Sequence, residues 1–185
     1  MMPIGVLMNE HRLIERMLGV VESEAGKART RNFIEPVFID TTIDFIRTYA
    51  DKTHHGKEEA ILFREAARKE LTPEDRGHLQ DLLGDHNFGR KTVGELAEAK
   101  QRYREEGDGF LEVILEKLVT LVDFYRNHIR KEDDVFFPAS SAYFSKEEQE
   151  AMLLEFWESD RKMIHEKYRS IVEALEGSEG GEGVK

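Results

Sequence analysis

Apolar side chains recur along most of the chain at the three- and four-residue spacing of an α-helix, and alternating runs typical of β-strands are absent. The pattern therefore predicts an all-α fold. Five helices are expected, at about residues 3–27, 36–71, 73–105, 108–137 and 145–176.

Local signals mark the ends of these predicted helices. Thr72 is expected to open the third helix as an N-cap, and Asp108 is a candidate cap for the fourth. Pro138 is expected to stop the fourth helix, because proline lacks the backbone N–H that a helix interior needs. Ser145 and Glu148 then form a capping box that starts the fifth helix.

Four long helices joined by short connections most simply form an up-down-up-down four-helix bundle. We assign residues 1–140 to this bundle and residues 141–176 to an additional C-terminal helix that packs on it. The tail at residues 177–185, GSEGGEGVK, has no apolar face to bury and is predicted to be disordered.

Charge and composition narrow the function. A net charge of −11 argues against nucleic acid or an anionic membrane surface as the main partner. The absence of cysteine excludes disulfides, iron–sulfur clusters and thiolate nucleophiles, so nitrogen and oxygen atoms would hold any metal. No run resembles a signal peptide or a membrane span, and we expect a cytoplasmic location.

Helical phase singles out one histidine on each of the four predicted bundle helices. Each shares the apolar stripe of its helix, and two of them have a glutamate four residues later on the same stripe. These inward residues are His11, His54, Glu58, His86, His128 and Glu132. Burying so many polar groups without a common partner would be costly, and a shared metal site would satisfy them together.

The remaining histidines fall outside this pattern. His55 and Glu59 follow polar neighbours, and an α-helical phase places both on an outer face. His78, in the first turn of its helix, and His165, among basic residues, are expected on the surface.

Two segments of the chain share the same pattern of residues. In HHGKEEAILF and HIRKEDDVFF, a histidine, a glutamate four residues on and a phenylalanine nine residues on coincide. The spacing of four lets two side chains of one helix reach a common metal. Nitrogen and carboxylate ligands suit iron, with manganese or zinc as alternatives. Two carboxylates also favour a pair of metal ions, with each glutamate bridging the two ions. Some coordination positions would then be left open for a small ligand.

The order of an early histidine, HxxxE, a histidine and a second HxxxE, with the segment NEHRLIERML, resembles the hemerythrin-like (HHE cation-binding) domains over about residues 5–140. The resemblance implies a non-haem diiron centre whose ligands are His11, His54, Glu58, His86, His128 and Glu132. True hemerythrins take two histidines from the third helix, whereas this chain offers one. Glu15, Tyr49, Tyr125 or water would supply the missing ligand, and Asp133 is the alternative to Glu132.

The function we expect is binding, or reduction, of dioxygen, nitric oxide or peroxide for sensing, storage or detoxification. One alternative is iron donation for the repair of damaged iron centres, as in relatives of this family. Another is a regulatory or scaffold bundle, in which the fifth helix, with Met152, Phe156, Trp157 and Ile164, docks a partner or forms a homodimer.

Overall fold

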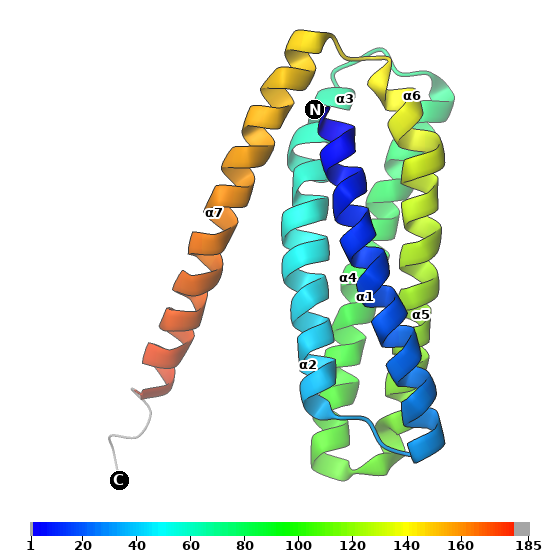
Figure 1. Ribbon diagram of the computed structural model, residues 1–185, viewed down its shortest axis with the longest axis vertical. Helices are drawn as coiled ribbons and strands as arrows, with labels where there is room; N and C mark the ends of the chain where they lie inside the picture. Colours follow the sequence, from blue (N-terminus) through cyan, green and yellow to red (C-terminus); the bar gives the residue numbers. More distant parts are fainter. Residues whose placement is uncertain (1, 180–185) are drawn as a thin grey trace.

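The computed structural model describes the backbone of residues 2–179 and the side chains of residues 2–163 and 167. Within this range the chain is helical and contains no strand, which confirms the all-α prediction. Four helical rods stand side by side with alternating direction, and α7 leaves from the end that carries the N-terminus (Figure 1). This is the predicted bundle with an additional C-terminal helix.

The first rod is α1 and the third is α4, while the second and fourth rods are each built from several consecutive helical segments. In chain order the elements are α1 (Pro3–Arg31), α2 (Pro36–Phe45), η1 (Ile46–His55), η2 (Glu58–Phe63), α3 (Arg64–Ala66), α4 (Pro73–Glu106), η3 (Asp108–Phe110), α5 (Leu111–Lys131), η4 (Glu132–Phe136), α6 (Phe137–Ser141) and α7 (Lys146–Glu179).

Two of the predicted helix starts have the expected cap. The Thr72 hydroxyl accepts a hydrogen bond from the backbone N–H of Asp75 at 3.1 Å. Ser145 and Glu148 exchange bonds as a capping box, with N–H to side-chain distances of 2.8 and 3.2 Å. These caps satisfy amide groups that a helix start leaves without intrahelical partners, so local chemistry sets these two starts.

Other helix ends lie at different residues from those predicted. Asp108 starts the short 3-10 turn η3, and Phe110 is the N-cap residue of α5. Pro138 does not stop the fourth rod, which continues from η4 through α6 to Ser141. The first rod is longer than predicted and ends at Asn32, whose φ of 53° is left-handed.

The segments η1, η2 and η4 are π-helical. A π-helix pairs each N–H with the carbonyl five residues back, so it turns by less per residue than the roughly 100° of an α-helix. Neighbouring side chains consequently point in more similar directions. In η1 both members of the pair His54 and His55 are buried, and Phe136 and Phe137 are buried together at the end of η4.

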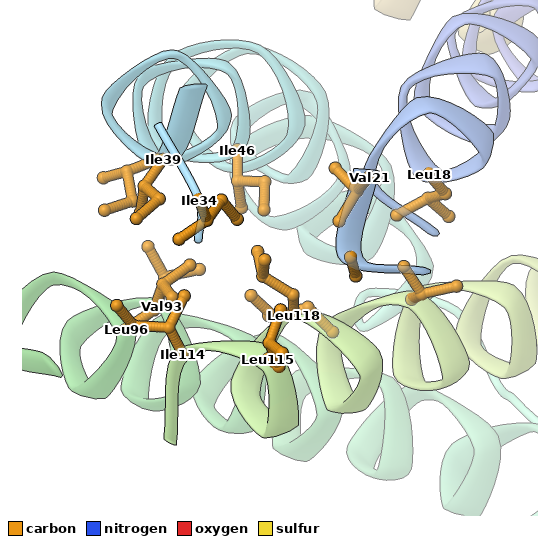
Figure 2. Packing of buried hydrophobic residues seen from close by; sticks show 14 of the residues in the cluster. Leu18, Val21, Ile34, Ile39, Ile46, Val93, Leu96, Ile114, Leu115 and Leu118 are labelled. Atoms are coloured by element: carbon orange, nitrogen blue, oxygen red, sulfur yellow. The ribbon is translucent and has the colours of Figure 1, made fainter. Parts of the chain in front are cut away.

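Two apolar clusters fill the bundle on either side of a polar layer. The distal cluster contains buried residues from 14–28, 34–50, 93–103 and 111–129. In Figure 2 its side chains from the first two rods, such as Leu18 and Ile39, point toward those of α4 and α5, such as Leu96 and Leu118. The proximal cluster contains Leu7, Ile61, Leu62, Phe63, Ala66, Leu79, Leu82, Phe136, Phe137, Phe144, Met152 and Phe156.

Helix α7 packs on the bundle through its first half. Met152 and Phe156 belong to the proximal cluster, whereas Trp157 remains half exposed. Further along, α7 is tilted away from the neighbouring rods (Figure 1), although Lys167 still pairs with Asp44 of α2 at 2.7 Å. The side chains of Ile164 and His165, and residues 180–185 of the predicted disordered tail, lie outside what the structure describes. None of the helices in residues 2–179 combines the length and apolar character needed to cross a membrane.

Candidate metal centre

Seven ionisable side chains fill the polar layer between the two apolar clusters. Each has at most 1% of its surface exposed, and together they come from all four rods. They are His11 on α1, His54 and His55 on η1, Glu58 on η2, His86 on α4, His128 on α5 and Glu132 on η4. Such a concentration of polar groups in a core is stable only if the groups satisfy one another or share a partner.

Their ligand atoms gather in two groups, within each of which all atoms lie within 4.8 Å of one another. One group contains three imidazoles and Glu58, and we call His55, His86 and His128 the three-histidine group. The other contains two imidazoles with Glu58 and Glu132, and we call His11 and His54 the two-histidine group.

Glu58 faces both groups. Its Oε1 lies 3.4 Å from Nε2 of His54, and its Oε2 lies 3.4 Å from Nε2 of His86. One oxygen of the carboxylate is therefore directed at each group, which is the arrangement that a bridging carboxylate requires.

Glu132 repeats this arrangement from the opposite rod. Its Oε2 lies 3.2 Å from Nε2 of His11 in the two-histidine group, and its Oε1 lies 3.3 Å from Nε2 of His128 in the three-histidine group. The two HxxxE segments that repeat in the sequence thus supply two carboxylates that both span the groups.

Several of these buried atoms have no hydrogen-bond partner. They are both oxygens of Glu58 and of Glu132, both ring nitrogens of His55, and Nε2 of His86 and of His128. An unsatisfied buried polar group costs about 1–3 kcal/mol, so five such side chains would together cost on the order of 5–15 kcal/mol. That is as large as the whole stability of a typical domain. The layer therefore requires a further partner.

The chemistry of the donor set fits a pair of metal cations. Each unsatisfied Nε2 and each carboxylate oxygen carries a lone pair directed at the shared space. In the two-histidine group, Nε2 of His11 and Nε2 of His54 lie 2.8 Å apart. Two imidazole nitrogens bound to one ion at about 2.1 Å and a right angle would be roughly 3 Å apart. The observed spacing matches two adjacent ligands of one cation.

A carboxylate lies beside the Nδ1 atom of every one of the five histidines. The Nδ1 to oxygen distances are 2.7 Å for His11 with Asp133, 3.0 Å for His54 with Glu10, 2.6 Å for His86 with Glu59, 3.3 Å for His128 with Asp85 and 3.4 Å for His55 with Asp51. A carboxylate hydrogen-bonded to Nδ1 holds the proton there, leaves the Nε2 lone pair free and orients the ring, as in many metal sites. Asp51 is close to His55, but Nδ1 of His55 has no hydrogen-bond partner.

Burial and charge act in opposite directions on the histidine pKa values. Burial disfavours the charged form of His11, but contacts with Asp133 and Glu132 outweigh it and raise its pKa to about 10. Burial likewise opposes charge on His86, but contacts with Glu132, Glu58 and Glu59 raise its pKa to about 11. Without a bound cation, the negative carboxylates thus draw protons onto two of the imidazoles, and a cation would have to displace those protons to bind at Nε2.

The bridging carboxylates remain ionised for the complementary reason. Burial would raise the pKa of Glu58, but the imidazoles of His54, His86 and His11 lower it to about 2. Burial and the charge of Glu58 also oppose ionisation of Glu132, yet its neighbouring imidazoles lower its pKa below the usual value. Two buried negative charges attract cations to this layer.

A comparison with protein families matches residues 2–140 to the Hemerythrin HHE cation binding domain. The chain belongs to the hemerythrin HHE cation-binding family. The matched residues contain all four rods of the bundle, and the buried histidine and glutamate cluster fits a metal-binding protein. No curated protein sequence matches the chain.

Within this hemerythrin-like domain, the six residues selected from the sequence all lie in the two groups. The expectation for His55 was wrong, because its side chain is buried and belongs to the three-histidine group. The π-helical turn of η1 explains the error, since the α-helical phase used for the prediction does not apply there. Glu59 was also misplaced: it accepts a hydrogen bond from Nδ1 of His86 instead of facing only solvent.

The doublet HH carried a signal that could have identified His55. The resemblance left the ligand set one histidine short, and η1 places a further buried histidine, His55, directly next to His54. The other candidates for the missing ligand lie elsewhere. Glu15 is 40% exposed and pairs with Arg12, and Asp133 contacts the outer nitrogen of His11.

The two tyrosine candidates for the missing ligand are not in either group, and neither is His78. Tyr125 stacks on the ring of His55 with centroids 6.0 Å apart, and Tyr49 is half-buried beside α7. His78, expected on the surface, is half-buried and lines a small cavity of about 80 Å³ away from both groups.

Proposed function

We propose that the seven buried side chains hold two iron ions and that this centre binds, and in a redox cycle reduces, a small ligand such as dioxygen, nitric oxide or peroxide. The observation that supports it best is the set of buried, unpartnered nitrogen and oxygen atoms directed at two shared points. In this proposal Glu58 and Glu132 would be shared between the ions, and the five histidines would each offer a ring nitrogen.

Iron is favoured by the donor set. Imidazole and carboxylate ligands without any thiolate suit iron, manganese and zinc, and five nitrogens with two carboxylates form a mixed set typical of non-haem iron. When bound, iron would supply one-electron redox chemistry and open positions for a small ligand. The protein residues would orient the ligands and exclude water.

Open positions follow from a count of donors. Two six-coordinate ions have about twelve positions, and five imidazole nitrogens with four carboxylate oxygens would occupy roughly nine of them. The two-histidine group would receive four of these donors and the three-histidine group five. A small exogenous ligand is therefore expected mainly at the two-histidine group.

The surroundings of the two-histidine group suit such a ligand. The ring of Phe137 stacks on His11 at a centroid distance of 5.6 Å, and Leu7, one turn before His11, is fully buried in the proximal cluster. An apolar wall of this kind excludes water and strengthens electrostatic interactions at the centre.

Metal analysis of protein purified in air tests the proposal. We expect about two irons per chain and a near-ultraviolet absorption that Glu132→Ala removes. Reduction followed by exposure to dioxygen, nitric oxide or peroxide, each in a separate sample, should change the spectrum for at least one ligand. A fully stable protein that purifies without metal and takes up no iron would contradict the proposal.

A further inference from the structure

Helix α7 lies outside residues 2–140, yet a chain of three charged side chains connects it to the candidate centre. Asp160 of α7 accepts a hydrogen bond from Nζ of Lys57 at 2.7 Å. The same Nζ also donates to Oε1 of Glu10 on α1. The other oxygen of Glu10 accepts a hydrogen bond from Nδ1 of His54 at 3.0 Å.

Lys57 is unusual because its side chain is completely buried. A buried ammonium requires anionic partners, and here it has a carboxylate from α1 on one side and one from α7 on the other. Phe156 of α7 helps to enclose it, with Nζ 5.9 Å from the ring centroid. The charge of Lys57 is therefore screened much less than a charge at the surface, whereas Asp160 is 40% exposed and is partly screened by solvent.

Cations also contact the outer carboxylates of other histidines, but those cations are exposed. Arg12 beside Asp133 is 54% exposed, Lys131 beside Asp85 is 53% exposed, and Arg90 beside Asp51 and Glu59 is 39% exposed. Solvent screening should make their influence on the adjacent histidines small. The contact made by Lys57 is the stronger candidate for transmitting a charge change to a histidine.

Close side-chain packing does not account for the position of Asp160. Next to it, a cavity of about 270 Å³ separates α7 from η1 and is lined by Glu10, Tyr49 and Met163 among others. The ion pair with Lys57 therefore connects α7 to the bundle at a point where packing is incomplete.

We propose that Asp160, acting through Lys57 and Glu10, is a positioning residue for His54, so that α7 sets the donor strength of the two-histidine group. This inference rests on the proposed function, because His54 must hold an ion for its donor strength to matter. Asp160 shares the positive charge of Lys57, which leaves more negative charge on Glu10. A more negative Glu10 accepts a stronger bond from His54 and makes its Nε2 a better metal ligand.

The test compares Asp160→Asn with Glu158→Gln in the full, iron-loaded chain. Glu158 is a matched control because it lies on the same helix and pairs with Arg161 and Lys162 of that helix. The measurements are iron content, the rate of iron release to a chelator, and the midpoint reduction potential.

For Asp160→Asn we expect unchanged iron content, iron release that is about three- to tenfold faster, and a higher reduction potential. Loss of an outer-shell partner in direct contact typically costs 10–100-fold in affinity, and Asp160 acts two contacts further out. The potential rises because removal of a negative charge disfavours the oxidised ions. Asp160→Glu should restore the wild-type values, and Glu158→Gln should not change them.

A double-mutant cycle with Glu10→Gln decides whether the effect passes through Glu10. Glu10→Gln alone should shift release and potential in the same direction by more, and adding Asp160→Asn should change little further. Additive effects, or an Asp160→Asn variant with wild-type release and potential, would overturn the inference. Failure of the proposed function would be distinguishable, because the wild-type chain itself would then hold no iron.

Discussion

The three-histidine and two-histidine groups share their carboxylates but lie in different surroundings. The three-histidine group lies toward two solvent-connected hollows, a cavity of about 260 Å³ that reaches His55 and Tyr125, and a broader groove of about 850 Å³ that reaches His128. The two-histidine group lies below the proximal cluster, on the side that α7 covers.

This difference indicates how one layer can hold two unequal ions. The group nearer to solvent has more nitrogen donors, so in the proposed centre its ion would have fewer open positions. The more enclosed group has fewer donors and a buried charge contact, and its ion would keep the positions that an external ligand could use. The two groups are therefore expected to divide the work, one ion held firmly and the other available for binding.

The largest effect is expected from removing a shared carboxylate. Glu58→Ala takes one donor from both groups at once, so both ions should be lost, with affinity reduced by more than about 100-fold, beyond the effect of outer-shell changes. Metal analysis after dialysis against a weak chelator measures this loss. The neighbouring Glu59→Ala removes only the outer partner of His86 and should lower affinity by roughly tenfold. Equal losses in the two variants would mean that Glu58 does not bridge.

A smaller and more selective effect is expected from the adjacent histidines. His54→Ala should remove the ion of the two-histidine group and with it the spectral response to nitric oxide. His55→Ala should weaken only the ion of the three-histidine group and leave that response largely intact. Each variant should retain about one iron per chain, and His78→Ala, away from both groups, should retain two.

These variants can also contradict the proposed difference between the two histidine groups. If His55→Ala retains two firmly held ions, His55 is a buried neighbour of the centre and not a ligand. If both variants abolish the nitric oxide response equally, the two groups act as one unit and the division between them is wrong.

The smallest expected effect is on stability, and it should distinguish the buried cation Lys57 from a half-exposed one. Lys57→Met keeps the apolar stem but leaves Glu10 without its buried cation, and we expect unfolding to become easier by about 1–3 kcal/mol. Lys131→Met removes a half-exposed partner of Asp85 and should cost at most about 0.5 kcal/mol. Chemical denaturation of the iron-loaded protein measures the free energy of unfolding of both variants. Equal losses of stability would mean that the buried cation and the exposed one do not differ.

Much of the site was predictable because amphipathic periodicity is a local property of the chain. Leu7, His11 and Ile14 share one face of α1 whatever surrounds it, and the same argument placed His86 and His128 in the core. Helix starts at Thr72 and Ser145 were also predictable, because caps depend on residues within a few positions.

His55 was not predictable in this way. Phase arguments assume the α-helical pitch, and η1 departs from it over ten residues. A π-helix is less favourable than an α-helix when isolated and persists where surrounding contacts stabilise it. The sequence of η1 shows no local signal for it, so the inward direction of His55 depends on the other rods.

The outer partners of the histidines were likewise missed. Asp133 contacts His11, Glu10 contacts His54 and Asp85 contacts His128, each from another rod. Sequence spacing cannot place side chains from different helices at 3 Å, because that depends on helix stagger and rotation in the packed bundle.

The sequence by itself determined the helical rods, their connections and six of the seven buried side chains of the polar layer, because short-range periodicity and capping encode these features. Only the tertiary structure decided that His55 faces inward, that each glutamate spans both groups, and that Lys57 is buried between α1 and α7. Each of these depends on contacts between rods far apart in sequence, and only packing brings those rods together.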